Sequence, residues 1–273
     1  MTAIAAPTIR KPAVAGLFYP GEAATLAAEV DGLLAVVRPM PGSVPKAIIV
    51  PHAGYQYSGP IAATAYARLA PARHTIRRVV LLGPAHREWF QGMALPSVTQ
   101  FRTPLGDVPL DGELAAQLAG LPGVVVRDDA HRLEHSLEVH LPFLQRLLDR
   151  FTLLPIAVSE ASAGQVARVL AAAWGGRETL IVISSDLSHY HDYATARGID
   201  AGTAAAIEML DGASLDGERA CGYLPVQGLL LEARSRGMTV ARADLRSSGD
   251  TAGPRGEVVG YGAWTFAEPQ ARR

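Results

Sequence analysis

The chain has 273 residues, with 25 Lys and Arg against 26 Asp and Glu, and 49% of its residues are hydrophobic. A net charge of -1 argues against a nucleic-acid-binding surface, and the high apolar content excludes a disordered chain. The single cysteine, Cys221, excludes an intramolecular disulfide and an all-thiolate zinc site. No apolar run is long enough to span a membrane, and residues 1–16 lack the charge order of a secretion signal. We therefore expect a globular, cytoplasmic protein that binds neither nucleic acid nor a membrane.

Short apolar segments rich in β-branched residues predict four buried strands, at residues 47–50, 78–82, 151–158 and 180–183. Helical apolar patterns lie between and after them, at residues 61–69, 112–118, 136–150, 163–174, 201–210 and 224–236. Such an alternation predicts a single α/β domain whose largely parallel or mixed sheet is covered by helices on both faces. Residues 239–245 and 257–264 predict a late strand pair, joined by turn residues at 247–250 and 253–254.

Three of the predicted strands are followed by residues that can bind a metal ion or carry a proton. His52 follows the first strand, His86 follows the second, and Asp186 and His189 follow the fourth. The carboxyl ends of parallel strands meet at one edge of a sheet, where α/β proteins bind their ligands. One such histidine alone would be an ordinary loop residue, but the repeated placement predicts a shared site. Tyr55, in the glycine-containing loop after His52, is expected to line its pocket.

A second group of histidines and acids lies at residues 131–140. His131, His135 and Glu138 share one face if a helix begins early enough, and that face would suit a metal site. Alternatively, Ser136 caps a helix that begins after it, which leaves both histidines in the preceding loop. Glu138 would then lie in the first turn, where the helix dipole favours an anion. Both interpretations stay open, and His135 is the member of the group that we expect beside the pocket.

Cys221 lies just before the last predicted helix. A cysteine near a helix N-terminus has a lowered pKa, which suits metal binding or nucleophilic attack, but free cysteine is also a common core residue. The sequence has no HExxH, GxSxG or Walker motif, and no GxGxxG after a strand. It therefore does not predict a zinc protease, an elbow-type serine hydrolase, a P-loop NTPase or a dinucleotide enzyme.

Five motifs in order resemble the Memo family, whose bacterial members are called AmmeMemoRadiSam system protein B. They are PHAGYQYSG at 51–59, GPAH at 83–86, EHSLEVHLP at 134–142, SSDLSH at 184–189 and CG at 221–222. The resemblance extends over residues 12–261, so we expect one Memo-like domain with a core at about residues 12–267.

The resemblance implies the fold of the class III extradiol dioxygenases and a metal site formed by His52, His86 and Cys221. It also implies that Asp186 and His189 lie in the pocket, with His189 where the dioxygenases keep an acid/base histidine. The dioxygenases have a glutamate where Cys221 stands here. Because a thiolate is a softer ligand than a carboxylate, it favours copper or a differently tuned iron. The implied cofactor is one iron or copper ion.

Three functions are compatible with these features. The first is a redox protein with iron or copper at His52, His86 and Cys221. If it is an enzyme, it is a non-heme oxidoreductase. The second is a non-catalytic adaptor whose pocket binds a small molecule, a peptide or a partner. Radical-SAM and AMMECR-type proteins are the partners that the family resemblance implies. The third is a Cys–His hydrolase that uses Cys221 with His52 or His189.

Overall fold

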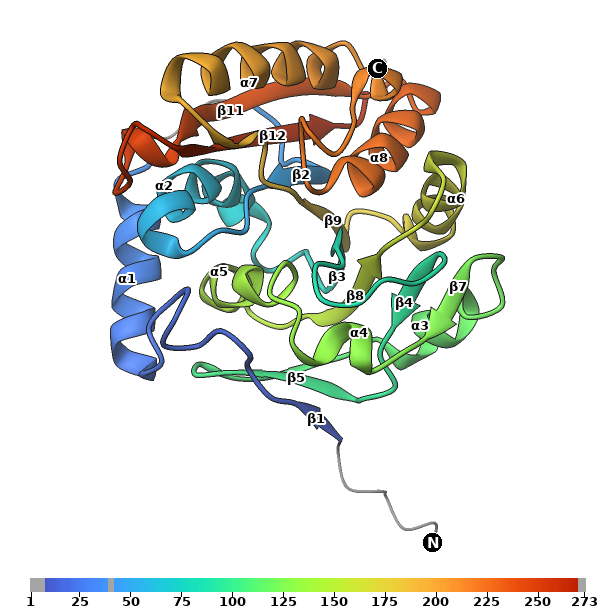
Figure 1. The fold of residues 1–273 in the computed structure, drawn as a ribbon. Coiled ribbons are helices and arrows are strands. Elements are labelled where there is room, and N and C mark those ends of the chain that lie inside the picture. The colour runs from blue at the N-terminus through green and yellow to red at the C-terminus, as the bar shows by residue number, and fades with distance from the viewer. Residues whose placement is uncertain (1–7, 39–41, 270–273) are drawn as a thin grey trace, which may run out of the picture.

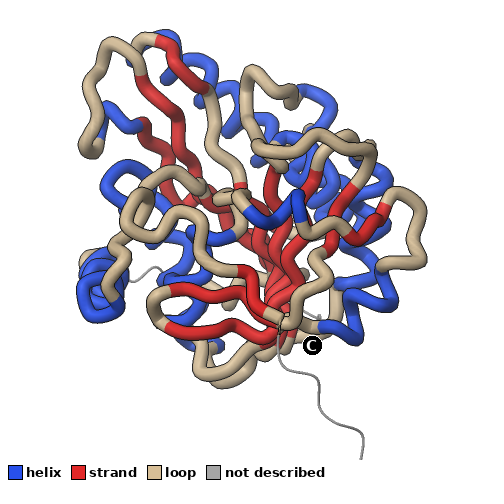
Figure 2. Tube along the Cα trace, turned by 60° about the horizontal axis from the view of Figure 1, so that its bottom comes forward, coloured by secondary structure: helices blue, strands red, loops and turns tan. Residues whose placement is uncertain are grey.

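The computed structural model describes residues 8–38 and 42–269 (Figure 1). The N-terminal stretch in which we expect no secretion signal thus lies partly outside the described residues. A large mixed sheet runs through the middle of the molecule, and helices lie on either side of it (Figure 2). This mixed α/β architecture confirms the fold class predicted from the sequence, and it is consistent with an extradiol-dioxygenase-like fold.

The large sheet has nine strands in the order β10-β12-β2-β9-β3-β8-β4-β7, and β11 also pairs with β12. Its strands are β2 (Ala47–Val50), β3 (Arg78–Pro84), β4 (Met93–Leu95), β7 (Val124–Val126), β8 (Thr152–Val158), β9 (Thr179–Ser184), β10 (His189–His191), β11 (Thr239–Ser247) and β12 (Val258–Ala267). A second sheet has three strands, β1 (Ile9–Arg10), β5 (Gln100–Thr103) and β6 (Gly106–Pro109).

The four central strands, β2, β9, β3 and β8, pair in parallel. These are the four buried strands that the sequence predicts, and each is nearly or fully apolar because both faces of the sheet are covered. The predicted late strand pair is also confirmed, since β11 and β12 pair antiparallel. β12 pairs antiparallel with β2 as well. The parallel part of the sheet therefore ends at β2. Beyond β2, the sheet continues with antiparallel strands from the C-terminal part of the chain.

Two apolar cores lie on the two faces of the sheet. Alternate side chains of one strand enter different cores, so that Ile48 and Val50 of β2 face one and Ile49 faces the other. The first core is covered by α1 (Ala23–Ala35), α2 (Tyr55–Tyr66) and α5 (Leu141–Leu147). The second is covered by α3 (Gly112–Leu118), α6 (Ala163–Ala173), α7 (Tyr193–Glu208) and α8 (Tyr223–Ser235). None of the described helices is long and apolar enough to cross a membrane.

The helix predicted at residues 136–150 is shorter in the structure, where α5 covers only Leu141–Leu147. A 3-10 turn, η2 (Glu138–His140), precedes the short helix α5, and Leu148 is already extended. Ser136 does not cap this helix, because its hydroxyl donates a hydrogen bond to the carbonyl oxygen of Pro84 at 2.7 Å. A partner from a distant strand has thus replaced the local cap that the sequence pattern favours.

Other boundaries also differ from the prediction, and several short elements were not predicted. Helix α7 begins eight residues earlier than expected, where the Asp192 carboxylate accepts hydrogen bonds from Ala194 and Thr195. The unpredicted elements are α1, α4 (Asp129–Arg132), β1, β4, β5, β6, β7 and β10, with the 3-10 turns η3 (Gly212–Ser214) and η4 (Ser248–Asp250). Most of them are too short to show a clear apolar period. The helix predicted at residues 61–69 is formed by α2 and the start of the 3-10 helix η1 (Ala67–Ala72).

The N-terminal segment at residues 10–19 is held by the carboxylate of Glu138. This side chain is fully buried and forms an ion pair with Arg10. It also accepts hydrogen bonds from the backbone N–H groups of Ala13 and Val14, at 2.7 and 3.0 Å, and from the Tyr19 hydroxyl at 2.5 Å. Glu138 therefore joins two distant parts of the chain, and it lies in the first turn of η2, where we expected an acid if both histidines lay in the preceding loop.

We predict that Glu138→Gln lowers the free energy of unfolding by about 3–5 kcal/mol, because it leaves the buried Arg10 guanidinium without its counter-charge. Urea denaturation followed by circular dichroism measures this change. The control is Glu218→Gln, which changes an exposed acid in the same way and should have little effect. Equal stability of the two variants would show that the Glu138 ion pair contributes nothing.

Candidate metal centre

The ends of three neighbouring parallel strands position the candidate site. His52 lies two residues after β2, His86 two residues after β3, and Asp186 two residues after β9. Because β9 pairs in parallel with both β2 and β3, all three residues leave the sheet at the same edge. The structure thus brings together the residues that the strand-end pattern singles out.

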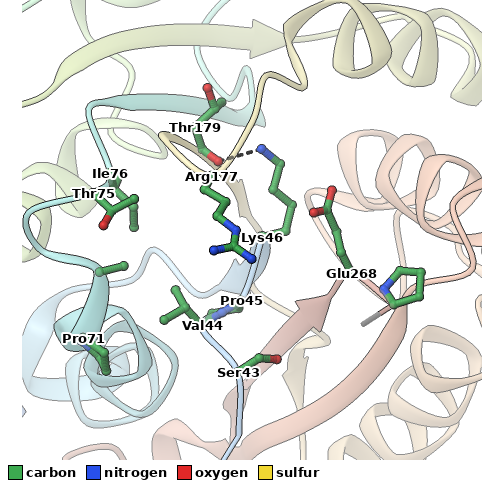
Figure 3. Close-up of a pocket in the computed structure, with 12 residues that line it drawn as sticks. Ser43, Val44, Pro45, Lys46, Pro71, Thr75, Ile76, Arg177, Thr179 and Glu268 are labelled. Atoms are coloured by element: carbon green, nitrogen blue, oxygen red, sulfur yellow. Dashed lines mark hydrogen bonds between the residues drawn. The ribbon is translucent and has the colours of Figure 1, made fainter. Parts of the chain in front are cut away.

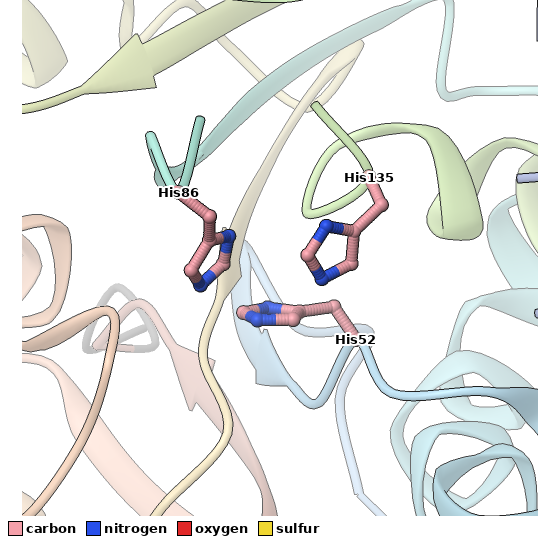
Figure 4. Close-up of side chains that lie close together, drawn as sticks. All are labelled: His52, His86 and His135. Atoms are coloured by element: carbon pink, nitrogen blue, oxygen red, sulfur yellow. The ribbon is translucent and has the colours of Figure 1, made fainter. Parts of the chain in front are cut away.

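Three imidazoles meet at this edge, as Figure 4 shows for His52, His86 and His135. One ligand atom from each ring lies within 4.8 Å of those of the other two. His52 is buried and His135 is partly buried, whereas His86 is open to solvent. His135 comes from the loop between α4 and η2, far in sequence from β2, β3 and β9. The cluster is therefore assembled from three separate loops and can be reached from outside.

Glu134 orients two of these histidines. Its carboxylate accepts hydrogen bonds from Nδ1 of His86 at 3.0 Å and from the backbone N–H of His86 at 2.5 Å. It also accepts from the backbone N–H groups of His135 and Ser136. Although burial alone would raise the pKa of Glu134, the hydrogen bonds from His86 and Ser136 lower it to about 2. The charged carboxylate holds the proton of His86 on Nδ1, which leaves the Nε2 lone pair available to a metal ion.

Asp186 touches His52 rather than His189. Its Oδ1 accepts a hydrogen bond from the backbone N–H of His52 at 2.7 Å, and its Oδ2 lies 3.9 Å from Nε2 of the same residue. Burial raises the pKa of Asp186 to about 6. Asp186 therefore does not orient the ring of His189, whose Nδ1 donates to the carbonyl oxygen of Leu187 at 2.8 Å. His189 begins β10 and is partly buried.

Cys221 lies on the His52 side of the cluster. Its sulfur is 3.4 Å from Nε2 of His52 and 3.7 Å from the carbonyl oxygen of Asp186. Gly222 makes this approach possible, since a Cβ there would lie 2.4 Å from the carbonyl oxygen of Ser184. Burial raises the pKa of the Cys221 thiol, so the lowered value expected from its place before α8 is wrong. Without a bound cation, this side chain is a neutral thiol.

The helical-face interpretation of residues 131–140 is not supported. His131 is buried apart from the cluster, where its Nε2 donates to the carbonyl oxygen of Ala94 at 2.9 Å. Glu138 holds the N-terminal segment, and only His135 of this group enters the imidazole cluster. Tyr55, which we expected to line the pocket, packs its ring against Phe143 and donates its hydroxyl to the carbonyl oxygen of Val139.

The chemistry of the donor groups fits a transition metal ion. Burial, and then the neighbouring histidines, lower the pKa of His52, and burial lowers the pKa of His135 to about 4. Both rings are therefore neutral near pH 7 and have a free lone pair. Nδ1 of His135 is buried without a hydrogen bond, 3.4 Å from Oε1 of Glu134. Neutral imidazoles beside a thiol are ligands that copper, iron and zinc accept.

The residues that hold the histidines in place were harder to predict than the histidines. Glu134 adjoins His135 in sequence, and a carboxylate beside a histidine is a signal for such support. Ser184 makes hydrogen-bond contacts with His52 and His140, yet nothing in the sequence distinguishes it from other serines at strand ends. These contacts join elements that are more than 40 residues apart in the chain.

A cavity of about 740 Å³ lies at the opposite, amino-terminal edge of the sheet (Figure 3). Its lining includes Lys46, Arg177 and Glu268. The Lys46 ammonium group donates hydrogen bonds to the carbonyl oxygens of Trp174, Gly176 and Thr179, so its three donors are all used. This cavity contains none of the clustered histidines, and its buried cation stabilises the chain around it.

Comparisons with known proteins agree with this architecture. The family model of Memo-like proteins matches residues 10–265. A MEMO1 family protein of Aquifex aeolicus is 39% identical over 264 residues, which cover 93% of this chain and 97% of that protein. A MEMO1 family protein of Methanothermobacter thermautotrophicus is 34% identical over 276 residues, 93% of this chain and 98% of that protein.

A crystal structure of an uncharacterized protein from Escherichia coli K12 has the same fold, with a TM-score of 0.55 and 15% sequence identity. The match covers 80% of this chain and 98% of that chain. At this identity the likeness concerns the fold alone. The extent of the family match and the identity to two full-length relatives show that the chain belongs to the Memo family.

Proposed function

We propose that this protein binds one redox-active transition metal ion, iron or copper, at the histidine cluster. The observation that carries this proposal is the approach of His52, His86 and His135, whose ligand atoms lie within 4.8 Å of one another. Three imidazoles this close together form a site for a borderline metal ion and not for calcium or magnesium, which prefer oxygen ligands. The choice of iron or copper rests on the resemblance to the Memo family.

His52 and His86 belong to both ligand sets that we consider. The family resemblance implies Cys221 as the third ligand, whereas the geometry adds His135. We propose that His135 completes the imidazole ligands and that Cys221, 3.4 Å from Nε2 of His52, supplies a thiolate on that side. A bound cation favours the deprotonated thiol, so its charge would offset the effect of burial on Cys221.

When bound, iron or copper supplies one-electron redox chemistry to a small-molecule ligand in the pocket. His189 keeps its proton on Nδ1 through Leu187, so its Nε2 is free to accept a proton from such a ligand. Asp186, with a pKa of about 6, is placed to hold a proton beside His52. The exposure of His86 leaves a path by which a ligand reaches the cluster.

The observations weigh against the Cys–His hydrolase. A hydrolase nucleophile needs a thiolate, and burial raises the pKa of Cys221. The adaptor hypothesis, with a peptide or with radical-SAM and AMMECR-type partners, rests on the family resemblance, and the cytoplasmic location rests on the sequence pattern alone. They are proposals of lower rank than metal binding.

We predict that His52→Ala and His86→Ala each abolish metal retention while leaving the fold intact, because both side chains lie on loops beyond the strand ends. Elemental analysis and circular dichroism of tag-free protein test this. His74→Ala is the control, since His74 is an exposed surface residue paired with Asp149. Full metal occupancy in both site variants would exclude the proposed ligands.

Two further variants separate the contributions of Cys221 and His135. We expect Cys221→Ser to retain metal but to lose the thiolate charge-transfer absorption of the copper(II) or iron(III) form. We expect His135→Ala to weaken metal binding without removing that absorption. An unchanged spectrum in metal-loaded Cys221→Ser would make Cys221 a packing residue, and an unchanged affinity in His135→Ala would remove His135 from the ligand set.

His189→Ala should keep the metal but lose about 10²–10⁴-fold of the metal-dependent rate, as expected for a general acid/base. Oxygen uptake by metal-loaded protein, with ascorbate as reductant, measures the rate. His191→Ala is the matched control, two residues further along the same strand. Loss of metal from His189→Ala would make His189 a ligand, and an unchanged rate would remove it from the chemistry.

A further inference from the structure

Behind the histidine cluster, the hydroxyl of Ser184 has three polar neighbours. Its Oγ lies 2.6 Å from Nδ1 of His52, 2.8 Å from Nε2 of His140 and 2.6 Å from the carbonyl oxygen of Ser136. Ser184 is the last residue of β9. It is buried, and so are its three hydrogen-bond partners. The space for this arrangement depends on Gly83, where a Cβ would lie 2.9 Å from the Ser136 hydroxyl and 3.1 Å from Cβ of Ser184.

The three contacts determine where each proton lies. A carbonyl oxygen only accepts hydrogen bonds, so the single Ser184 hydroxyl proton points to Ser136. The two remaining lone pairs of Oγ face ring nitrogens, and each of these nitrogens must therefore donate. His52 then carries its proton on Nδ1, and His140 carries its proton on Nε2.

The hydrogen bond at the other ring nitrogen of His140, Nδ1, agrees with this assignment. With its proton on Nε2, His140 has a lone pair on Nδ1, and the Tyr66 hydroxyl lies 2.9 Å away as its donor. Tyr66 and His140 are buried, so neither group has water as an alternative partner. Every donor and acceptor from Tyr66 to Ser136 is thus paired in one pattern. The opposite tautomer of His52 would leave either its own Nδ1 or the Ser136 carbonyl oxygen without a proton.

We infer that Ser184 is a positioning residue that fixes His52 in the Nδ1–H tautomer and so presents the Nε2 lone pair to the metal site. Nε2 of His52 faces the sulfur of Cys221 and, at 3.9 Å, the carboxylate of Asp186. A proton on Nε2 would occupy the position at which His52 binds the ion. The metal part of this inference rests on the proposed function, whereas the tautomer itself is a property of the metal-free protein.

The first test is nitrogen-15 NMR of the histidine rings in metal-free protein at neutral pH, which distinguishes the two tautomers. The His52 signals are assigned by their loss in His52→Ala. We expect the Nδ1–H form of His52 in the natural protein, and a shift toward the Nε2–H form in Ser184→Ala. The matched control is Ser188→Ala, because Ser188 is equally buried and makes no hydrogen bond to any of the described histidines.

The second test is the affinity for copper(II) and iron(II), measured by competition with a chelator. Ser184→Ala should bind each ion about 10–100-fold more weakly than Ser188→Ala, as found when supporting hydrogen bonds at metal sites are removed. If Ser184→Ala does not fold, Tyr66→Phe keeps the ring and removes the donor to His140. Because Ser184 is intact in this variant, we then expect His140 to stay in the Nε2–H form and His52 in the Nδ1–H form, and a change of the His52 tautomer would contradict the inference.

Two results would overturn the inference. One is an Nε2–H tautomer of His52 in the natural, metal-free protein, and the other is equal metal affinity of Ser184→Ala and Ser188→Ala. Failure of the proposed function would look different. The natural protein would then bind neither ion, while the NMR experiment would still report the tautomer that Ser184 imposes.

Discussion

The parallel pairing of β2, β9 and β3 is the constraint on which the candidate site depends. Parallel strands with a common direction end at a common edge, and each of these three delivers a polar side chain two residues later. The strands themselves are buried on both faces and cannot shift in register without moving apolar side chains between the two cores. The sheet therefore fixes the spacing of His52, His86 and Asp186 more firmly than their loops do.

Burial at this edge keeps the imidazoles of His52 and His135 neutral. Taking an imidazolium out of water is costly, and for His52 and His135 burial outweighs any neighbouring carboxylate. Neutral rings could still point their protons toward the centre of the cluster. Glu134 prevents this at His86, and the hydrogen bonds of Ser184 have the corresponding effect at His52. Neutrality and orientation thus have separate causes in the same small region.

Two buried carboxylates in one short segment connect the site to the N-terminal part of the chain. Glu134 holds His86, and Glu138 holds Arg10 and the backbone that follows it. The same N-terminal segment brings Phe18 against the ring of His135, with ring centroids 4.8 Å apart. Segment 10–19 is therefore part of the wall around the cluster, and its attachment through Glu138 affects how firmly His135 is held.

The sequence by itself determined the central strands, the fold class, the family and the placement of His52 and His86 after strand ends. These features depend on local apolar patterns and on motifs that are continuous in the chain. Cys221 illustrates the limit of such patterns, since proximity to a helix suggested a lowered pKa while burial in the folded protein raises it.

Only the tertiary structure decided which groups meet. His135 enters the cluster while His131, four residues earlier, binds the carbonyl oxygen of Ala94. The Ser136 hydroxyl donates to the carbonyl oxygen of Pro84 instead of capping a helix. Ser184 contacts three residues from two distant segments. A buried polar group forms a hydrogen bond with a group that lies within about 3 Å of it after folding. Because residues far apart in the sequence can meet at that distance, the spacing along the chain does not predict the partner.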